Sequence, residues 1–247
     1  MDFNYKKPLH LFALFLIFLS VSFLIILPVL SYGGYIGNLQ DSETTESLGM
    51  ISEILLLFFQ LAMSIVLLVL FPIIWYYLVN NLSAKEALSK MKLKLENIDI
   101  AFMWGISTAV LIFVIFFIVN IFIALFFNLD SENLSNVEDL EALFSPVSLF
   151  ILVATQPIAE EIFFRGFLLD KIDSYAGQNI AIVSTAILFG LAHASYGKLY
   201  PIILPMIMGI LLGYIVVRTK NLTTAIIAHV CFNVGVLFLA FLAGTLG

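Results

Sequence analysis

Residues 100–128 of the chain, IAFMWGISTAVLIFVIFFIVNIFIALFFN, contain no charged side chain. A helix needs about 20 mostly apolar residues to cross the hydrocarbon core of a bilayer, which is about 30 Å thick. An open strand would leave its backbone groups without hydrogen bonds in lipid, so the stretch predicts a membrane-spanning helix. The fold class that we expect from this segment is all-α.

Composition extends this interpretation to all 247 residues. Hydrophobic residues make up 62% of the chain and charged residues 11%, whereas soluble domains have about 45–50% and about 25%. The formal charge of −6 argues against the extended basic face that binding to nucleic-acid phosphates requires, so we expect no nucleic-acid partner. A single cysteine, Cys231, excludes an internal disulfide and any site built from several thiolates.

Further apolar runs of spanning length predict a polytopic helical bundle. The first run follows Lys6 and Lys7, but it is longer than the apolar part of a signal peptide and has no small-residue cleavage pattern, so we expect it to be retained. One integral membrane domain then covers 1–247, with three helices and their loops in 1–143 and a second part in 144–247. The seven expected spans lie near residues 9–31, 54–78, 100–128, 146–170, 179–195, 199–217 and 222–246.

Basic residues predict the topology, because they gather in alternate loops. The stretches 32–50 and 129–143 contain neither Lys nor Arg, and only Lys198 departs from the alternation. The positive-inside rule therefore places the N-terminus in the cytoplasm of a multi-pass protein, in the plasma membrane if the cell is prokaryotic. The residues on the cytoplasmic side are Lys6, Lys7, Lys85, Lys90, Lys92, Lys94, Lys171, Arg218 and Lys220.

Ionisable residues occur at membrane depth only in the C-terminal half. Each costs about 2.5 kcal/mol or more to insert, so such residues indicate a functional site. They lie in three stretches: AEEIFFR at 159–165, FGLAH at 189–193 and HVCFN at 229–233.

Spacing assigns roles within these stretches. Glu161 and Arg165 are four residues apart with the carboxylate first, the favourable order for an ion pair on one helix face, so we expect them to be structural. Glu160 points about 100° away from Glu161 around the helix and has no counter-charge nearby in the sequence. The same spacing of four joins Phe189 to His193 and His229 to Asn233.

Depth and chemistry favour hydrolysis. Counting helical residues from the expected cytoplasmic turn near 173–178 places Glu160 and His193 at the same distance from that side of the membrane, about 20 Å. The same kind of count for His229 differs from this depth by about 10 Å. A carboxylate in an apolar cavity can act as a general base on water, with His193 assisting it. His229 and Asn233 can donate hydrogen bonds to the oxyanion of an attacked peptide carbonyl.

Two other site chemistries were weighed against this one. A serine protease is disfavoured because the chain has no G-x-S-x-G motif. Glu160, His193 and His229 also form a set of two histidines and a carboxylate suited to zinc, although no H-E-x-x-H is present. The residues alone leave a zinc site and a metal-free site both open.

The three motifs together resemble a known family. E-E-x-x-x-R at 160–165, F-x-x-x-H at 189–193 and H-x-x-x-N at 229–233 resemble, in this order, the CPBP family of CAAX proteases, bacteriocin-processing proteins and Abi proteins. The resemblance covers about 146–240 and implies an intramembrane glutamate endopeptidase whose core is formed by the fourth to seventh spans, within 144–247.

The resemblance also implies a role for each motif residue. Glu160 would activate the water, His193 would assist, and His229 with Asn233 would form the oxyanion site. Glu161, Arg165 and Phe189 would support them. No cofactor is implied, and a metalloprotease-like zinc ion is the alternative that is not favoured. The implied partners are the lipid bilayer and a peptide or protein substrate, with prenylated, signal and bacteriocin-type peptides as candidates.

Two non-proteolytic functions remain as alternatives. The polar residues could be a buried network in a membrane immunity or scaffolding protein. Intramembrane Glu and His also build proton relays in transporters, but the chain shows no inverted repeat.

Overall fold

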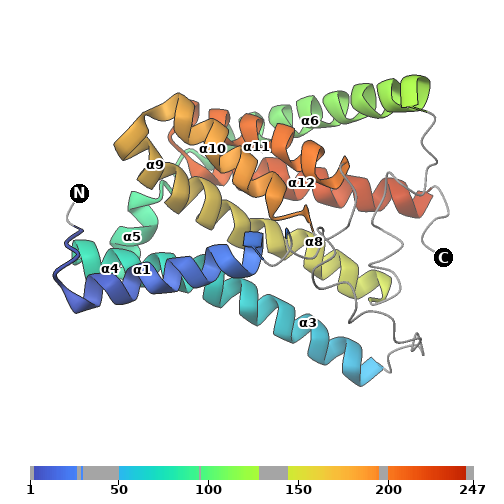
Figure 1. Cartoon of the computed structure of the whole chain (residues 1–247). Helices are drawn as coiled ribbons and strands as arrows, with labels where there is room; N and C mark the ends of the chain where they lie inside the picture. Colours follow the sequence, from blue (N-terminus) through green and yellow to red (C-terminus); the bar gives the residue numbers. More distant parts are fainter. Residues whose placement is uncertain are drawn as a thin grey trace.

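The computed structural model describes residues 3–26, 29, 50–94, 96–127, 144–194 and 200–242 (Figure 1). All regular secondary structure in these residues is helical, which confirms the all-α prediction. Three segments are π-helical and are labelled η. The elements are α1 (Pro8–Val21), η1 (Ser22–Ile26), α3 (Met50–Ser64), η3 (Ile65–Leu70), α4 (Phe71–Asn80), α5 (Ala84–Lys90), α6 (Ile98–Phe127), α8 (Pro146–Glu161), η5 (Ile162–Leu168), α9 (Leu169–Ala176), α10 (Gln178–Leu191), α11 (Tyr200–Thr219) and α12 (Leu222–Leu242).

Within the described residues, six helices are long and apolar enough to cross a membrane, and they correspond to six of the seven predicted spans. They are Pro8–Ile26, Ile51–Asn80, Ile98–Phe122, Pro146–Ala176, Pro201–Thr219 and Leu222–Leu242. The predicted span 179–195 is instead the shorter helix α10, whose 14 residues extend about 21 Å. This helix is shorter than the hydrocarbon core, and residues 195–199 lie outside the described part of the chain.

The helix Pro146–Ala176 runs through the centre of the bundle. In Figure 1, α1, α3 and α4 lie on one side of it, whereas α6, α10, α11 and α12 lie on the other. Half of the residues in the most apolar stretch of this helix are buried, whereas at most a third are buried in the corresponding stretches of the other spans. Phe163, Phe164 and Phe167 join residues from both sides in one hydrophobic core. The middle of this helix, from Ala159 to Phe167, is therefore largely surrounded by protein.

The central helix is irregular where its charges lie. Pro157 interrupts α8 and has no N–H to donate, and the π-helical η5 begins directly after Glu161. Short π-helical turns inside α-helices occur frequently at functional sites. The helix therefore departs from regular α-helical hydrogen bonding on both sides of the acidic pair.

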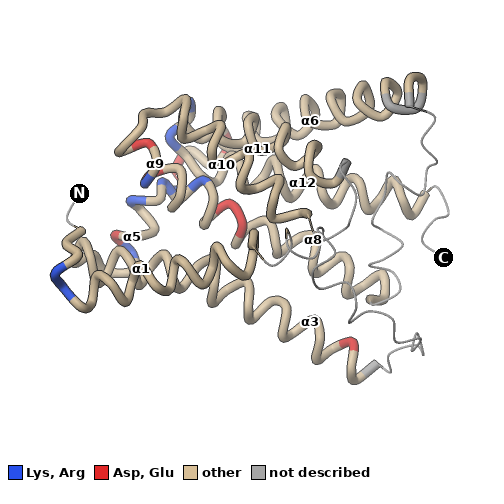
Figure 2. Tube along the Cα trace, in the orientation of Figure 1, with Lys and Arg blue, Asp and Glu red and all other residues tan. Residues whose placement is uncertain are grey.

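Charged residues gather at the end of the bundle that holds the N-terminus (Figure 2). The lysine-rich loop forms the short helix α5, capped by Ser83 and Glu86. The orientation of this end in the membrane remains a prediction. The acidic stretches 32–50 and 129–143 lie almost wholly outside the described residues.

Candidate active site

The acidic pair Glu160–Glu161 stands at the end of α8, near the middle of the helix Pro146–Ala176. Glu161 is completely buried, and its Oε1 accepts a hydrogen bond from Nη1 of Arg165 at 2.6 Å. Arg165 is completely buried as well. The two residues form the ion pair that their spacing predicts. Glu160 keeps 16% of its side chain exposed, so the two neighbouring carboxylates differ in their access to solvent.

The guanidinium of Arg165 is held between aromatic rings and a glycine. Its central carbon lies 4.3 Å from the ring centroid of Phe189 and 5.8 Å from that of Phe164, which permits cation–π attraction. A Cβ at Gly209 would lie 3.2 Å from Nη2, so the glycine leaves room for the guanidinium. Within the described residues, Nε and Nη2 of Arg165 and Oε2 of Glu161 have no hydrogen-bond partner. The ion pair therefore depends mainly on its single short contact.

His229, on α12, contacts both carboxylates. Its Nδ1 lies 2.9 Å from Oε1 of Glu161, and its Nε2 lies 3.8 Å from Oε2 of Glu160. A carboxylate accepts hydrogen bonds, so we assign a proton to Nδ1. The mismatch in depth of about 10 Å expected for His229 is absent, because α12 packs directly against α8. The side chain is 2% exposed and links α12 to the central helix.

His193 follows the last residue of α10 and lies in a turn rather than in a helix. Its Nδ1 is 2.8 Å from the carbonyl oxygen of Phe189, and because a carbonyl only accepts, Nδ1 donates. The neutral ring then presents an unprotonated Nε2. The Phe189 ring is completely buried, with its centroid 4.9 Å from that of His193 and 5.6 Å from that of His229. Phe189 therefore separates and orients the two imidazoles.

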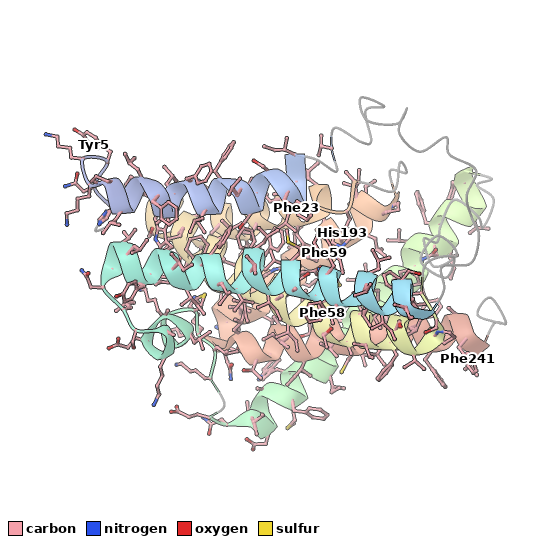
Figure 3. All side chains as sticks on the ribbon, turned by 90° about the horizontal axis from the view of Figure 1, so that it is seen from below. Tyr5, Phe23, Phe58, Phe59, His193 and Phe241 are labelled. Carbon is pink, nitrogen blue, oxygen red and sulfur yellow. The ribbon has the colours of Figure 1, made fainter. Side chains whose placement is uncertain are left out.

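Contacts through Phe189 also join His193 to the rest of the site. The Phe189 ring lies against both imidazoles, and His229 in turn contacts both carboxylates. Figure 3 shows His193 within the outline of the bundle, whereas the labelled Phe241 lies at its edge. The structure thus links His193 to the acidic pair through Phe189 and His229, and the predicted meeting of His193 with Glu160 remains a prediction.

Asn233 lies one helical turn after His229 on α12 and is partly buried. In the part of the chain that the structure describes, its side chain makes no hydrogen bond. The amide therefore retains its donors for a ligand. Its predicted place in an oxyanion site remains a prediction.

Gln156 and Ser64 were not predicted as site residues. Gln156 lies on α8 one turn before Glu160, and its Oε1 accepts a hydrogen bond at 2.7 Å from the hydroxyl of Ser64 at the end of α3. This bond ties α3 to the face of α8 that carries Glu160. The signal was present in the sequence, since Gln156 is a polar residue four positions before the acidic pair in an apolar run.

Glu160, His193 and His229, the residues suited to zinc by type, are not arranged as a metal site in the described residues. Among the described residues, no group of three His, Cys, Asp or Glu side chains is placed to hold a metal ion. Nδ1 of His229 is engaged with Glu161, which leaves only its Nε2 facing Glu160. We therefore derive no step through zinc, and the cofactor-free site remains a prediction.

Comparison with known protein families identifies a model that matches the C-terminal part of the chain. Residues 142–235 match the family model of type II CAAX prenyl endopeptidases, Rce1-like. This segment is Rce1-like. It spans α8 to most of α12 and contains the three motifs that carry the resemblance, which is thereby confirmed. No curated protein and no solved structure matches the chain. The Rce1-like segment comprises the central helix, α10, α11 and most of α12, whereas α6, on the same side of the central helix, lies outside it.

Proposed function

We propose that the protein is an intramembrane endopeptidase that hydrolyses a peptide bond with water activated by Glu160. The observation that carries this proposal is the asymmetry of the acidic pair. Glu161 is completely buried and engaged by Arg165 and His229, whereas Glu160 is partly exposed and, among the residues that the structure describes, forms an ion pair only with His229, at 3.8 Å. Glu160 is therefore the carboxylate that can reach a water molecule. The Rce1-like match of residues 142–235 supports the same class of reaction.

In the proposed reaction, the Glu160 carboxylate removes a proton from water as the oxygen attacks the peptide carbonyl. The unprotonated Nε2 of His193 can accept the second hydrogen of that water and so orient it. The carbonyl oxygen becomes an oxyanion, which the Asn233 amide stabilises, with His229 assisting when Nε2 is protonated. The peptide C–N bond then breaks, and the protonated Glu160 returns its proton to the amine.

The position of the site favours substrates that enter the bilayer. Glu160 lies 16 residues before Ala176, about 24 Å along the helix, and is surrounded by apolar spans. Lipid modification contributes about 0.8 kcal/mol per buried CH₂ to membrane binding, so it would concentrate a peptide at this depth. We therefore propose prenylated C-terminal peptides as the first substrates to test, ahead of signal or bacteriocin-type peptides.

The test uses the purified protein and a panel of fluorogenic peptides with and without a prenyl group. Glu160→Gln keeps the size of the side chain but removes the base, and we expect activity to fall by about 10²–10⁴-fold with an unchanged unfolding temperature. Arg218→Gln, at an exposed position at the end of α11 and outside the three motifs, is the control and should keep its activity. Full activity in Glu160→Gln would refute the role of Glu160. Loss of activity on treatment with a chelator, restored by zinc, would favour the metal alternative.

A membrane immunity or scaffolding protein is the second candidate. The observation that favours it is the completely buried Glu161–Arg165 pair with His229, since such a network can serve packing alone. In that case Glu160→Gln would keep the biological phenotype at normal abundance, and no peptide of the panel would be cleaved.

A further inference from the structure

A polar cavity lies at the end of the bundle where the lysines gather. It has a volume of about 180 Å³ and is formed where the segment before α6 meets the turn between α11 and α12. Its lining includes Lys94, Asn97, Trp104, Lys220, Asn221 and Thr224, and one carboxylate, that of Glu96. None of these residues takes part in the proposed reaction.

We infer that this cavity binds the phosphodiester headgroup of an anionic phospholipid. Lys94 and Lys220 approach it from segments far apart in the sequence, and both are exposed. Neither ammonium group has an ion pair within the described residues, in contrast to Lys90 and Lys171, which pair with Asp170. Two cations against the single carboxylate of Glu96 leave a net positive charge for a phosphate group.

Thr224 gives an independent indication of a ligand. It lines the cavity and is completely buried, and its hydroxyl oxygen has no hydrogen-bond partner among the described residues. A buried hydroxyl without a partner is unfavourable, so an acceptor in the cavity would be stabilising once rotation of the Thr224 side chain turns the hydroxyl toward it. A phosphate oxygen is such an acceptor.

Two hydrogen bonds within the protein hold the walls of the cavity in place. The N–H of Leu222 donates to the carbonyl of Lys92 at 2.8 Å, and the hydroxyl of Thr223 donates to the carbonyl of Lys94 at 2.7 Å. Both bonds join the segment before α6 to the start of α12. The cavity is therefore preformed, which lowers the entropic cost of binding.

The surroundings favour a lipid over a free phosphate ion. Trp104 and Ile100, on the first turns of α6, line the cavity and are about half exposed. Tryptophan is enriched where a membrane-spanning helix meets the headgroup region, so Trp104 places the cavity at headgroup depth. The exposed apolar surface of α6 continues from it and can contact the acyl chains.

The experiment compares the full-length protein in nanodiscs of phosphatidylcholine alone with nanodiscs that also contain phosphatidylglycerol. Bound lipid is counted by native mass spectrometry after release, and thermal unfolding is recorded. The test variant is Lys94→Gln with Lys220→Gln. The matched control is Lys7→Gln with Lys85→Gln, which removes the same charge from exposed positions outside the cavity. Thr224→Val removes the hydroxyl while keeping the shape.

We expect the wild type and the control to retain phosphatidylglycerol and unfold at a higher temperature with it. The test variant should bind it about tenfold more weakly, the loss expected for a charged hydrogen bond, and Thr224→Val should weaken binding in the same direction. Equal losses in the test and control variants would overturn the inference in favour of general surface attraction. No preference for phosphatidylglycerol would also overturn it. If inorganic phosphate in phosphatidylcholine nanodiscs stabilises the wild type alone as much, the ligand is a free anion and the lipid assignment is wrong.

Discussion

Removal of Arg165 should destabilise the protein far more than removal of both partners of its ion pair. In Arg165→Met, the Glu161 carboxylate remains completely buried and loses its 2.6 Å contact. Breaking a buried pair by removing one partner costs about 3–5 kcal/mol. Part of this cost is the cation–π contact with Phe189, at 4.3 Å, which is worth about 2 kcal/mol at such a desolvated site. We therefore expect a loss of about 4 kcal/mol in the free energy of unfolding.

The double variant Glu161→Leu with Arg165→Met removes both charges and keeps similar volumes. Such replacements are often neutral or stabilising. One cost remains, because Nδ1 of His229 loses its acceptor at 2.9 Å, which corresponds to about 1–2 kcal/mol. The double variant should therefore be more stable than Arg165→Met by about 2 kcal/mol or more.

Thermal unfolding in detergent measures the difference. A change of 1 kcal/mol shifts the midpoint by about 2–4 °C for a chain of this size, so Arg165→Met should lower it by about 8–16 °C. Arg218→Met, an exposed arginine at the end of α11, is the control and should leave the midpoint unchanged. A loss below about 1 kcal/mol in Arg165→Met, or additive losses in the double variant, would refute this account of the pair.

Three further outcomes test other contacts. Gly235→Ala places a Cβ 2.5 Å from Cζ of Phe113, so we expect α6 and α12 to shift apart. The free energy of unfolding should fall by about 1–3 kcal/mol, and an unchanged midpoint of thermal unfolding would contradict this close packing. Gln156→Ala removes the hydrogen bond from Ser64, so it should lower the free energy of unfolding by about 1 kcal/mol and reduce peptide cleavage. Unchanged cleavage would show that this bond does not contribute to the active site. Donation from the hydroxyl and N–H of Ser83 lowers the pKa of the Glu86 carboxyl below 4.5, so this cap is present above pH 4.5 and is lost as the pH falls through the lowered pKa. Hydrogen exchange of α5 should show that loss. Ser83→Ala removes the hydroxyl but keeps the N–H, so it should weaken the pH dependence without abolishing it.

Sequence patterns predicted the features that depend on a single helix. The spacing of Glu161 and Arg165 predicts a contact on one helix face, and the structure has it. The positions of six spans follow from apolar length alone, because lipid requires every backbone group to be bonded within its helix. Local geometry is sufficient for both predictions.

Contacts between helices could not be predicted in the same way. Periodicity shows which residues share a face but not which helix faces it, so the contact of His229 with Glu161 was not foreseen and its depth was misjudged. The bond between Ser64 and Gln156 was missed for the same reason. The end of α10 before His193 was also missed, because the apolar pattern continues beyond the point where the helix stops.

The geometry of the central helix explains how two adjacent glutamates can differ in function. Consecutive residues point about 100° apart, so Glu160 and Glu161 cannot face the same neighbours. The side chain of Glu161 is directed to Arg165, on the same helix, and to His229 on α12. Glu160 is left on the face that is partly open, and His229 is the residue that contacts both. Because His229 is fixed by the buried carboxylate, its Nε2 is held at a defined position beside the exposed one. The Glu161–Arg165 pair thus positions His229 next to Glu160, where the proposed reaction needs it. Packing alone does not require a buried ion pair, so this positioning is a reason for a membrane protein to retain one.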